Sequence, residues 1–284
     1  MHPNVYALSA IALWASLASL GLLLRHVPPF LLTGVALLVG SMPAWPLVRQ
    51  WKVPLPTLAL GVYGLFGFHF LLFIALRHAP PVEANLVNYL WPLLIVVLAP
   101  VFLPPLRLRA QHLVAAALGF AGAALAILGA AGGDLRGGWS WGYLPALGSA
   151  FIWASYSLLT RRVQAFPTAA IGLFGAVSGV LALACHLALE PRVALDSRDL
   201  LLLAAMGLGP LGAAFFLWDK ALKAGDPRQI GVLSYITPLA STLLLMLVSG
   251  REFRWSVAAA AALIVVSALV GTRAPRDLPA AGSR

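Results

Sequence analysis

Ten long apolar blocks constrain this 284-residue chain more than any other feature of its sequence. Each block is ended by charge, proline or glycine, and the connections are only a few residues long. The blocks cover residues 5–24, 29–48, 57–76, 81–103, 110–130, 139–160, 168–189, 199–222, 227–249 and 255–272. A helix needs roughly 20 mostly apolar residues to cross a bilayer, whereas barrel strands are about ten residues long and alternate in polarity. The pattern predicts an all-α, polytopic membrane protein with ten transmembrane helices.

The composition excludes a water-exposed surface of ordinary extent. Charged residues make up 10% of the chain and apolar residues 61%, against about 25% and 45–50% in soluble domains. The net charge of +10 is scattered between the apolar blocks rather than gathered into a patch, so we expect the lipid bilayer and no nucleic acid as a partner. One cysteine, Cys185, offers no disulfide within a single chain and no zinc or redox spacing. We therefore predict no metal and no cofactor.

The distribution of Lys and Arg predicts the orientation of the helices. Ten spans put both termini on one side, and that side has 12 of the 19 basic residues while the opposite side has seven. The positive-inside rule then places both termini in the cytoplasm. The start of the chain, Met1-His2-Pro3-Asn4, lacks the positive region of a signal peptide. We expect the first block to be a retained span.

The two halves of the chain resemble each other. Trp14-Ala15-Ser16 in the first block corresponds to Trp153-Ala154-Ser155 in the sixth. Segments 75–93 and 221–239 share a loop proline, a tyrosine and a proline three residues after the tyrosine. Five spans per copy is an odd number, so the second copy must enter the membrane from the opposite side. Inverted repeats of this kind recur in secondary transporters, whose substrate sites lie near the midplane where the copies meet.

The repeat divides the chain into three parts. We predict a first five-helix repeat over residues 1–137 and an inverted second repeat over 138–273. The polar, proline-containing end at 274–284 is expected to be a disordered cytoplasmic tail.

The run Glu83-Ala84-Asn85-Leu86-Val87-Asn88-Tyr89-Leu90-Trp91-Pro92-Leu93 resembles the signature of the YddG-type aromatic amino acid exporters. Paired five-helix repeats with a proline in the fourth helix of each are similar to the EamA type of the drug/metabolite transporter superfamily. This resemblance covers residues 5–272, although the specific run is short. It implies a multi-pass protein of the bacterial inner membrane that exports aromatic and other neutral amino acids, with organic cations as further cargo. It also implies a central cavity lined by helices one, three, four, six, eight and nine.

Four residues of the fourth block share one helical face. Asn85, Asn88, Tyr89 and Pro92 stand at i, i+3, i+4 and i+7. Amide side chains at membrane depth are costly in lipid and are expected to face protein or a wet cavity. Their donors and acceptors suit the ammonium and carboxylate of an amino acid. The alternative is that they only join helices, a role worth about 0.6 kcal/mol per hydrogen bond.

Proline marks both copies of the fourth helix. Pro92 and Pro238 lack an amide proton and break a helical hydrogen bond, which predicts a kink. The kink either exposes backbone at the site or only shapes packing. In the second copy Gly231, Ser234 and Tyr235 take the places of the first-copy polar residues. This stripe is less polar, so Tyr235 is a weaker candidate to contact substrate.

Three further residues lie deep within predicted spans. Most membrane tryptophans lie at the interfaces, but Trp14 and Trp153 fall near the middle of their blocks. They either stack on an aromatic ligand or a cation or only pack. His69 is the one histidine well inside a block. It either binds a carboxylate or carries a proton, or it is a neutral ring bonded to a backbone carbonyl.

Charged residues at the ends of blocks have simpler explanations. Asp219 and Lys220 fall near the cytoplasmic end of the eighth block, and we interpret them as residues of the cavity mouth. Lys220 is long enough to reach the interface, whereas Asp219 needs a partner. Glu83 begins the fourth block, where it complements the helix dipole.

Other functions are poorly supported. The sequence contains no glycine-rich P-loop, so ATP does not drive transport from this chain. Coupling stays open between facilitated diffusion and proton exchange through His69. A carrier for other metabolites or organic cations is the main alternative. An intramembrane enzyme would need clustered His, Asp, Ser or metal ligands, and the six His residues show no such spacing. The sequence does not fix the oligomeric state, and a monomer is compatible with it.

Overall fold

The structure is a computed structural model that describes residues 2–104, 106–131, 138–249 and 255–272. All regular secondary structure in these residues is helical. The helices and three short helical turns are α1 (Pro3–Ala15), α2 (Leu17–Leu23), α3 (Pro29–Ser41), η1 (Met42–Trp51), α4 (Leu55–Val62), η2 (Tyr63–Gly67), α5 (Phe68–His78), α6 (Pro81–Asn88), α7 (Trp91–Phe102), α8 (Ala110–Ala131), α9 (Tyr143–Leu159), α10 (Ala170–Leu189), α11 (Ser197–Leu208), η3 (Gly209–Ala213), α12 (Ala214–Ala224), α13 (Pro227–Leu233), α14 (Ile236–Ser249) and α15 (Trp255–Thr272).

Eight helical segments of the described chain are long and apolar enough to cross a membrane. Several of them join two or three helical elements, for example α4, η2 and α5 in the segment Leu55–His78. The other two predicted blocks contain the shorter helices α9 and α15. The prediction of an all-helical membrane protein is confirmed. The predicted tail at 274–284 lies outside the described residues. The predicted boundary between residues 137 and 138 lies at the edge of another segment outside them.

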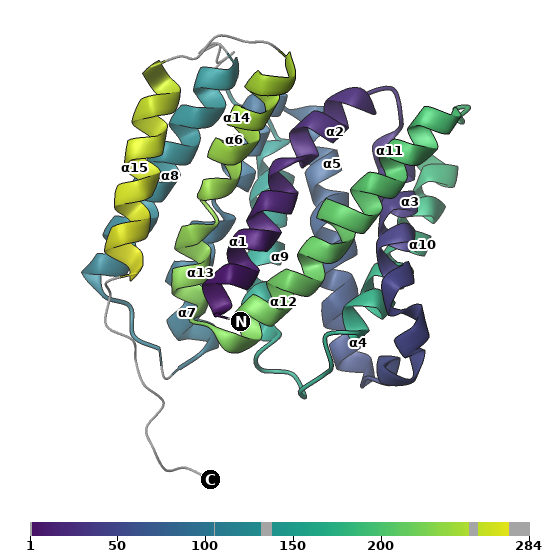
Figure 1. Cartoon of the computed structure of the whole chain (residues 1–284), viewed down its shortest axis with the longest axis horizontal. Coiled ribbons are helices and arrows are strands. Elements are labelled where there is room, and N and C mark those ends of the chain that lie inside the picture. The colour runs from purple at the N-terminus through teal and green to yellow at the C-terminus, as the bar shows by residue number, and fades with distance from the viewer. Residues whose placement is uncertain (1, 105, 132–137, 250–254, 273–284) are drawn as a thin grey trace.

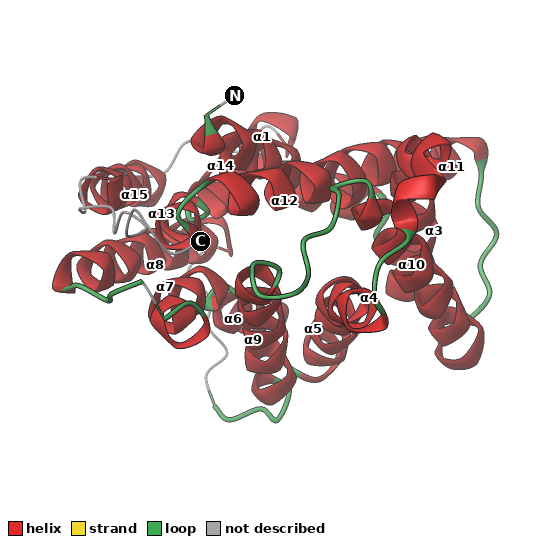
Figure 2. Cartoon of the chain, turned by 90° about the horizontal axis from the view of Figure 1, so that it is seen from below, coloured by secondary structure: helices red, strands yellow, loops and turns green. Residues whose placement is uncertain are grey.

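The helices form an elongated bundle. The pair α8 and α15 lies at one end of it, and α3, α10 and α11 lie at the other (Figures 1 and 2). Between these ends, α1, α12 and α14 form one side, and α5, α6 and α9 form the side that faces them (Figure 2). The first residues of α1 and the last residues of α15 both point to the lower side of the bundle in Figure 1.

Two predicted spans are interrupted one turn before a proline. The helix ends at Asn88 and resumes at Trp91 ahead of Pro92, and it ends at Leu233 and resumes at Ile236 ahead of Pro238. Proline has no N–H for the carbonyl four residues earlier, and its ring crowds that carbonyl. The backbone tightens locally, because the amide of Leu90 donates to the carbonyl of Val87 at 3.1 Å instead of four residues back.

Small residues bring the helix backbones close together. A Cβ placed on Gly34 of α3 would lie 3.1 Å from the carbonyl oxygen of Gly179 in α10. A Cβ on Gly40 would lie 2.7 Å from the carbonyl oxygens of Gly207 and Leu211. Close approach of this kind is how membrane helices gain packing energy without a hydrophobic driving force between them. It fixes α3 against α10, α11 and η3.

Adding one methyl group at Gly40 should therefore destabilise the fold. Gly40→Ala meets backbone atoms that cannot rotate away, and overpacking of this kind costs about 1–3 kcal/mol. The unfolding temperature in detergent should fall. The matched control is Gly21→Ala, because a Cβ at Gly21 has no atom within 4 Å. Equal unfolding temperatures for the two variants would contradict this account of the packing.

Candidate functional site

A cavity of about 580 Å³ lies within the bundle. This volume suits a small organic ligand, since ligand pockets usually measure about 300–1,000 Å³. Side chains of α1, α2, α3, α5, α6, α7, α9, α11, α12 and α14 line it, together with the turn η3, the segment between α2 and α3, and Tyr89 in the break between α6 and α7. Six of the predicted substrate-contacting residues line this cavity: Trp14, His69, Asn85, Asn88, Tyr89 and Trp153. The structure therefore gathers residues that are far apart in the sequence around one cavity.

The end of α6 supplies the polar side of the cavity. Asn85 and Asn88 lie one turn apart, and Tyr89 is the first residue of the helix break. Asn88 is buried, and the hydroxyl of Ser149 in α9 donates to its Oδ1 at 2.8 Å. This bond fixes the amide of Asn88 and also joins α6 to α9. Asn85, Asn88 and Tyr89 all line the cavity, so this wall offers amide and hydroxyl groups to a ligand.

His69 is oriented by a backbone carbonyl. Its Nδ1 lies 2.6 Å from the carbonyl oxygen of Leu65, and because a carbonyl only accepts, Nδ1 carries the proton. Leu65 belongs to the π-helical turn η2, just before α5. The Nε2 atom is then an acceptor in a neutral ring. Phe68 packs edge-on against this ring, with their centroids 5.1 Å apart.

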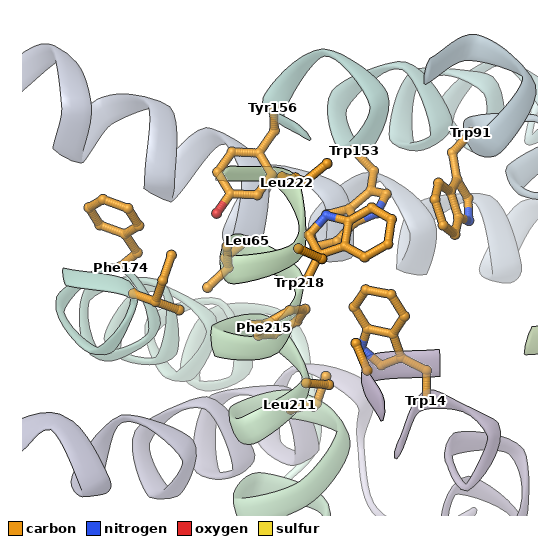
Figure 3. Packing of buried hydrophobic residues seen from close by; sticks show 14 of the residues in the cluster. Trp14, Leu65, Trp91, Trp153, Tyr156, Phe174, Leu211, Phe215, Trp218 and Leu222 are labelled. Carbon is orange, nitrogen blue, oxygen red and sulfur yellow. The ribbon is translucent and has the colours of Figure 1, made fainter. Parts of the chain in front are cut away.

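Four tryptophans pack together beside the cavity, and we call them the tryptophan cluster: Trp14, Trp91, Trp153 and Trp218. Their indoles come from α1, α7, α9 and α12 and are drawn together in Figure 3. The ring centroids of Trp14 and Trp218 are 5.2 Å apart, and those of Trp14 and Trp153 are 5.8 Å apart. Such distances are typical of attractive aromatic pairs. All four tryptophans are buried, and three of them, Trp14, Trp91 and Trp153, line the cavity.

The polar edges of two cluster members are satisfied. The indole N–H of Trp14 donates to the carbonyl of Pro210 at 3.0 Å, within the π-helical turn η3. The indole N–H of Trp218 donates to the hydroxyl of Ser157 in α9 at 3.1 Å. A buried indole without such a partner would be costly. These two bonds hold the cluster in one arrangement.

Trp91, Trp218 and Phe215 were not predicted from the sequence. Trp91 stands three residues after Asn88, so helical spacing alone could have placed it on the same face. Trp218 directly precedes Asp219 within an apolar block, and a tryptophan inside a span is uncommon enough to be a signal. Phe215 carries no such signal, because phenylalanine is ordinary in a span.

Asp219 and Lys220 lie below the tryptophan cluster and do not line the cavity. Asp219 is buried, and its Oδ2 accepts from the hydroxyl of Thr168 at 2.6 Å and from Lys223 Nζ at 2.7 Å. Asp219 thus has the partner that a short buried carboxylate needs. Lys220 is exposed and lies 5.7 Å from the ring centroid of Tyr6.

The helices α13 and α14, which correspond to α6 and α7 in the first half, contribute to the cavity through residues that were not predicted. Tyr235 is fully buried, and a Cβ on Gly119 of α8 would lie 2.2 Å from its ring, so it packs against α8. Thr237 and Ser241 of α14 line the cavity instead. Because the helix is interrupted at Ser234 and Tyr235, simple helical spacing across the break does not give the face of Tyr235. Pro92 and Pro238 follow the two breaks but do not line the cavity.

Comparison with known proteins identifies the family. The EamA-like transporter family matches the chain twice, over residues 3–128 and 140–272. The chain belongs to the EamA-like transporter family. A protein of Ancylobacter novellus named aromatic amino acid exporter YddG is 41% identical over 272 residues, which are 93% of this chain and 94% of the relative. The prediction from the motif at 83–93 is confirmed at the level of family and relative.

A solved structure supports the fold. A crystal structure with 39% sequence identity superimposes on this EamA-like chain with a TM-score of 0.87, covering 95% of this chain and 97% of the other. Together with the long apolar helices and the bacterial relative, this confirms a multi-pass protein of the bacterial inner membrane. Transport across the membrane, rather than chemical conversion, is the work of the family.

Removing polar groups from the α6 wall should impair transport. Asn88→Ala and Tyr89→Ala each delete a hydrogen-bonding group that a substrate would use, which we expect to slow transport about tenfold. Transport into or out of reconstituted vesicles, normalised to folded protein, measures the effect. Leu22→Ala is the control, because Leu22 is 46% exposed on α2 and does not line the cavity. Wild-type rates in both wall variants would move the site elsewhere.

Proposed function

We propose that this protein exports aromatic and other neutral amino acids from the cytoplasm by alternating access. The observation that carries the proposal is the cavity itself, which combines an aromatic wall with an amide and hydroxyl wall in a chain 41% identical to an aromatic amino acid exporter. An aromatic amino acid has the same two parts. Its ring and its polar backbone would each meet a matching surface.

The fit can be stated residue by residue. The ring of the substrate packs against Trp14, Trp153 and Phe68, which line the cavity from α1, α9 and α5. Its polar end lies against Asn85 and Tyr89. Offset and edge-on aromatic contacts add about 0.5–1.5 kcal/mol to the burial of the ring. Larger or rigid substrates are limited by the volume of about 580 Å³.

The chain would form ten transmembrane helices as two inverted five-helix repeats, with both termini in the cytoplasm. The double match to one family, over 3–128 and 140–272, supports two copies. The interruptions before Pro92 and Pro238, at corresponding places in the two halves, support the same arrangement. The excess of Lys and Arg on the side of the termini supports the orientation.

In this orientation the cavity opens toward the periplasm. It extends from Trp14 to Arg25, which follows α2 at the upper side of the bundle in Figure 1. The tryptophan cluster then blocks the path to the cytoplasm. Two oppositely oriented halves give two similar conformations, one open to each side. Export requires the cluster to separate and the periplasmic ends to close.

Polar contacts below the cluster would hold the closed cytoplasmic side. Trp218 of α12 donates to Ser157 of α9. The ammonium group of Lys223 donates to the carbonyl of Phe166 at 2.8 Å, in the connection between α9 and α10. Arg161 donates to the carbonyl of Gly225 at 3.1 Å, just beyond α12. All three contacts link α12 to α9 or to the segment that follows it, so they must break when these helices move apart.

The helix breaks would supply the motion. Residues Tyr89 and Leu90 lie outside both α6 and α7, and the amide of Leu90 donates only three residues back, to Val87, so the helical segments on either side would tilt at this weakened point of the backbone. Ser234 and Tyr235 offer the same freedom between α13 and α14. Pro92 and Pro238 maintain these breaks by withholding a backbone donor. We therefore assign the two prolines as hinge residues.

Transport from reconstituted vesicles tests the proposal. Vesicles are loaded in turn with labelled Phe, Trp, Thr and Lys, and efflux is followed with and without a proton gradient. Phe and Trp should leave faster than Lys, because the cavity is mainly apolar and no acidic residue lines it. Vesicles without protein and vesicles with Trp153→Ala are the controls. Efflux equal to that from vesicles without protein, for every amino acid, would overturn the proposed function.

A further inference from the structure

One formal charge faces the cavity. Of the described residues that line it, Arg25 alone is charged, and none is Asp or Glu. Arg25 lies between α2 and α3 and is exposed. No described residue forms a hydrogen bond or ion pair with its guanidinium. The open end of the cavity therefore has a cationic, unpaired donor group.

A buried carboxylate at the start of α3 is already engaged. The side chain of Glu190 is fully buried, and it accepts from the backbone N–H of Phe30 at 3.0 Å and of Leu31 at 3.2 Å. Arg77 donates to the same carboxylate at 3.1 Å, and His186 lies 3.0 Å from it. Glu190 thus caps α3 from another helix. It has no remaining role as a counter-ion for Arg25.

The other acidic residues at this end that the structure describes also have partners. Asp199 lies 3.1 Å from His26 Nε2 and accepts from the backbone N–H of Asp196 at 3.2 Å. Asp199 is therefore paired with His26, the residue that follows Arg25. Glu83 accepts a hydrogen bond from the hydroxyl of Tyr143. Since no described carboxylate pairs with Arg25, its charge is available to a mobile anion or to the ligand.

We propose that Arg25 determines specificity by binding the carboxylate of the substrate, so that the cavity accepts aromatic carboxylates even without an amino group and discriminates against aromatic amines. The inference rests on the proposed function and narrows its substrate class. A guanidinium presents two parallel donors that match a carboxylate, and such pairs are stronger than neutral hydrogen bonds. An ammonium group in the same cavity meets only neutral acceptors and one like charge.

The asymmetry of charge has a consequence for the choice of substrate. A zwitterionic amino acid gains from its carboxylate and loses little from its ammonium, which the amide and hydroxyl wall can accept. A deaminated analogue keeps the stronger contact and drops the weaker one. A decarboxylated analogue keeps the weaker contact and meets the repulsion of Arg25. The charge pattern therefore ranks three molecules that share the same ring.

Three ligands separate these contributions: phenylalanine, 3-phenylpropanoate and phenethylamine. Binding to the purified full chain in detergent can be followed by tryptophan emission, because Trp14, Trp91 and Trp153 line the cavity. Direct binding avoids the passive membrane permeation of the uncharged forms of the last two ligands. We expect 3-phenylpropanoate to bind roughly three- to tenfold more tightly than phenethylamine. Raising the ionic strength should shrink this ratio, since a rim charge is screened by salt.

Variants of one residue carry the test. Arg25→Gln should bring the two ligands to similar affinities, and Arg25→Lys should restore most of the preference for the carboxylate. Arg192→Gln is the matched control, because Arg192 is exposed and follows Glu190 at the same end of the bundle but does not line the cavity. Unfolding temperatures of all variants separate loss of folding from loss of specificity.

Each outcome has one meaning. Tighter binding of 3-phenylpropanoate that disappears in Arg25→Gln and survives in Arg25→Lys supports the proposal. Equal or tighter binding of phenethylamine by the unaltered protein, or an unchanged preference in Arg25→Gln, overturns it while phenylalanine binding still supports the transporter. Absence of binding by phenylalanine and both analogues overturns the proposed function as well.

Discussion

The structure depends on one constraint, which is that backbone polar groups in the hydrocarbon layer must be satisfied within the protein. Helices meet this requirement everywhere except where the chain is interrupted, and the main interruptions lie beside the cavity. Pro92 and Pro238 each end a helical ladder where the protein rather than lipid surrounds the backbone. At Pro210 the carbonyl of the turn η3 accepts the indole N–H of Trp14. Helix breaks thus supply both the shape of the site and hydrogen bonds within it.

The two ends of the cavity differ in the interactions that surround them. At the proposed closed end, rings from four helices form the tryptophan cluster, and the indole N–H of Trp218 donates to Ser157. Above it, acidic residues are committed to structural roles, as Glu190 is to the start of α3. The tryptophan cluster contains no charged residue. Separating its rings would therefore not expose an ion pair of the cluster to lipid. The polar contacts add specificity to the closed arrangement.

The sequence predicted the membrane class, the family and most of one wall of the cavity. Asn85, Asn88 and Tyr89 were found because helical spacing holds within the short helix and its end. The same spacing misplaced the expectation for Tyr235, because the break at Ser234 and Tyr235 rotates the following residues, and Thr237 reaches the cavity instead. Trp218 was missed because contacts between α12 and α9 are set by tertiary packing. Arg25 was counted only as a loop charge, since nothing in sequence shows that its acidic neighbours have other partners.

The central claim is that one cavity is reached from the periplasm while the tryptophan cluster closes it to the cytoplasm. Ala18 lines the cavity on α2, so Ala18→Cys in a Cys185→Ser background provides a reporter thiol. A membrane-impermeant maleimide is added to right-side-out and to inside-out vesicles. Fast labelling from the periplasmic face, slow labelling from the cytoplasmic face, and faster cytoplasmic labelling after Trp218→Ala would support the account. Equal labelling from both faces, or labelling that is faster from the cytoplasm in the unaltered cluster, would contradict it.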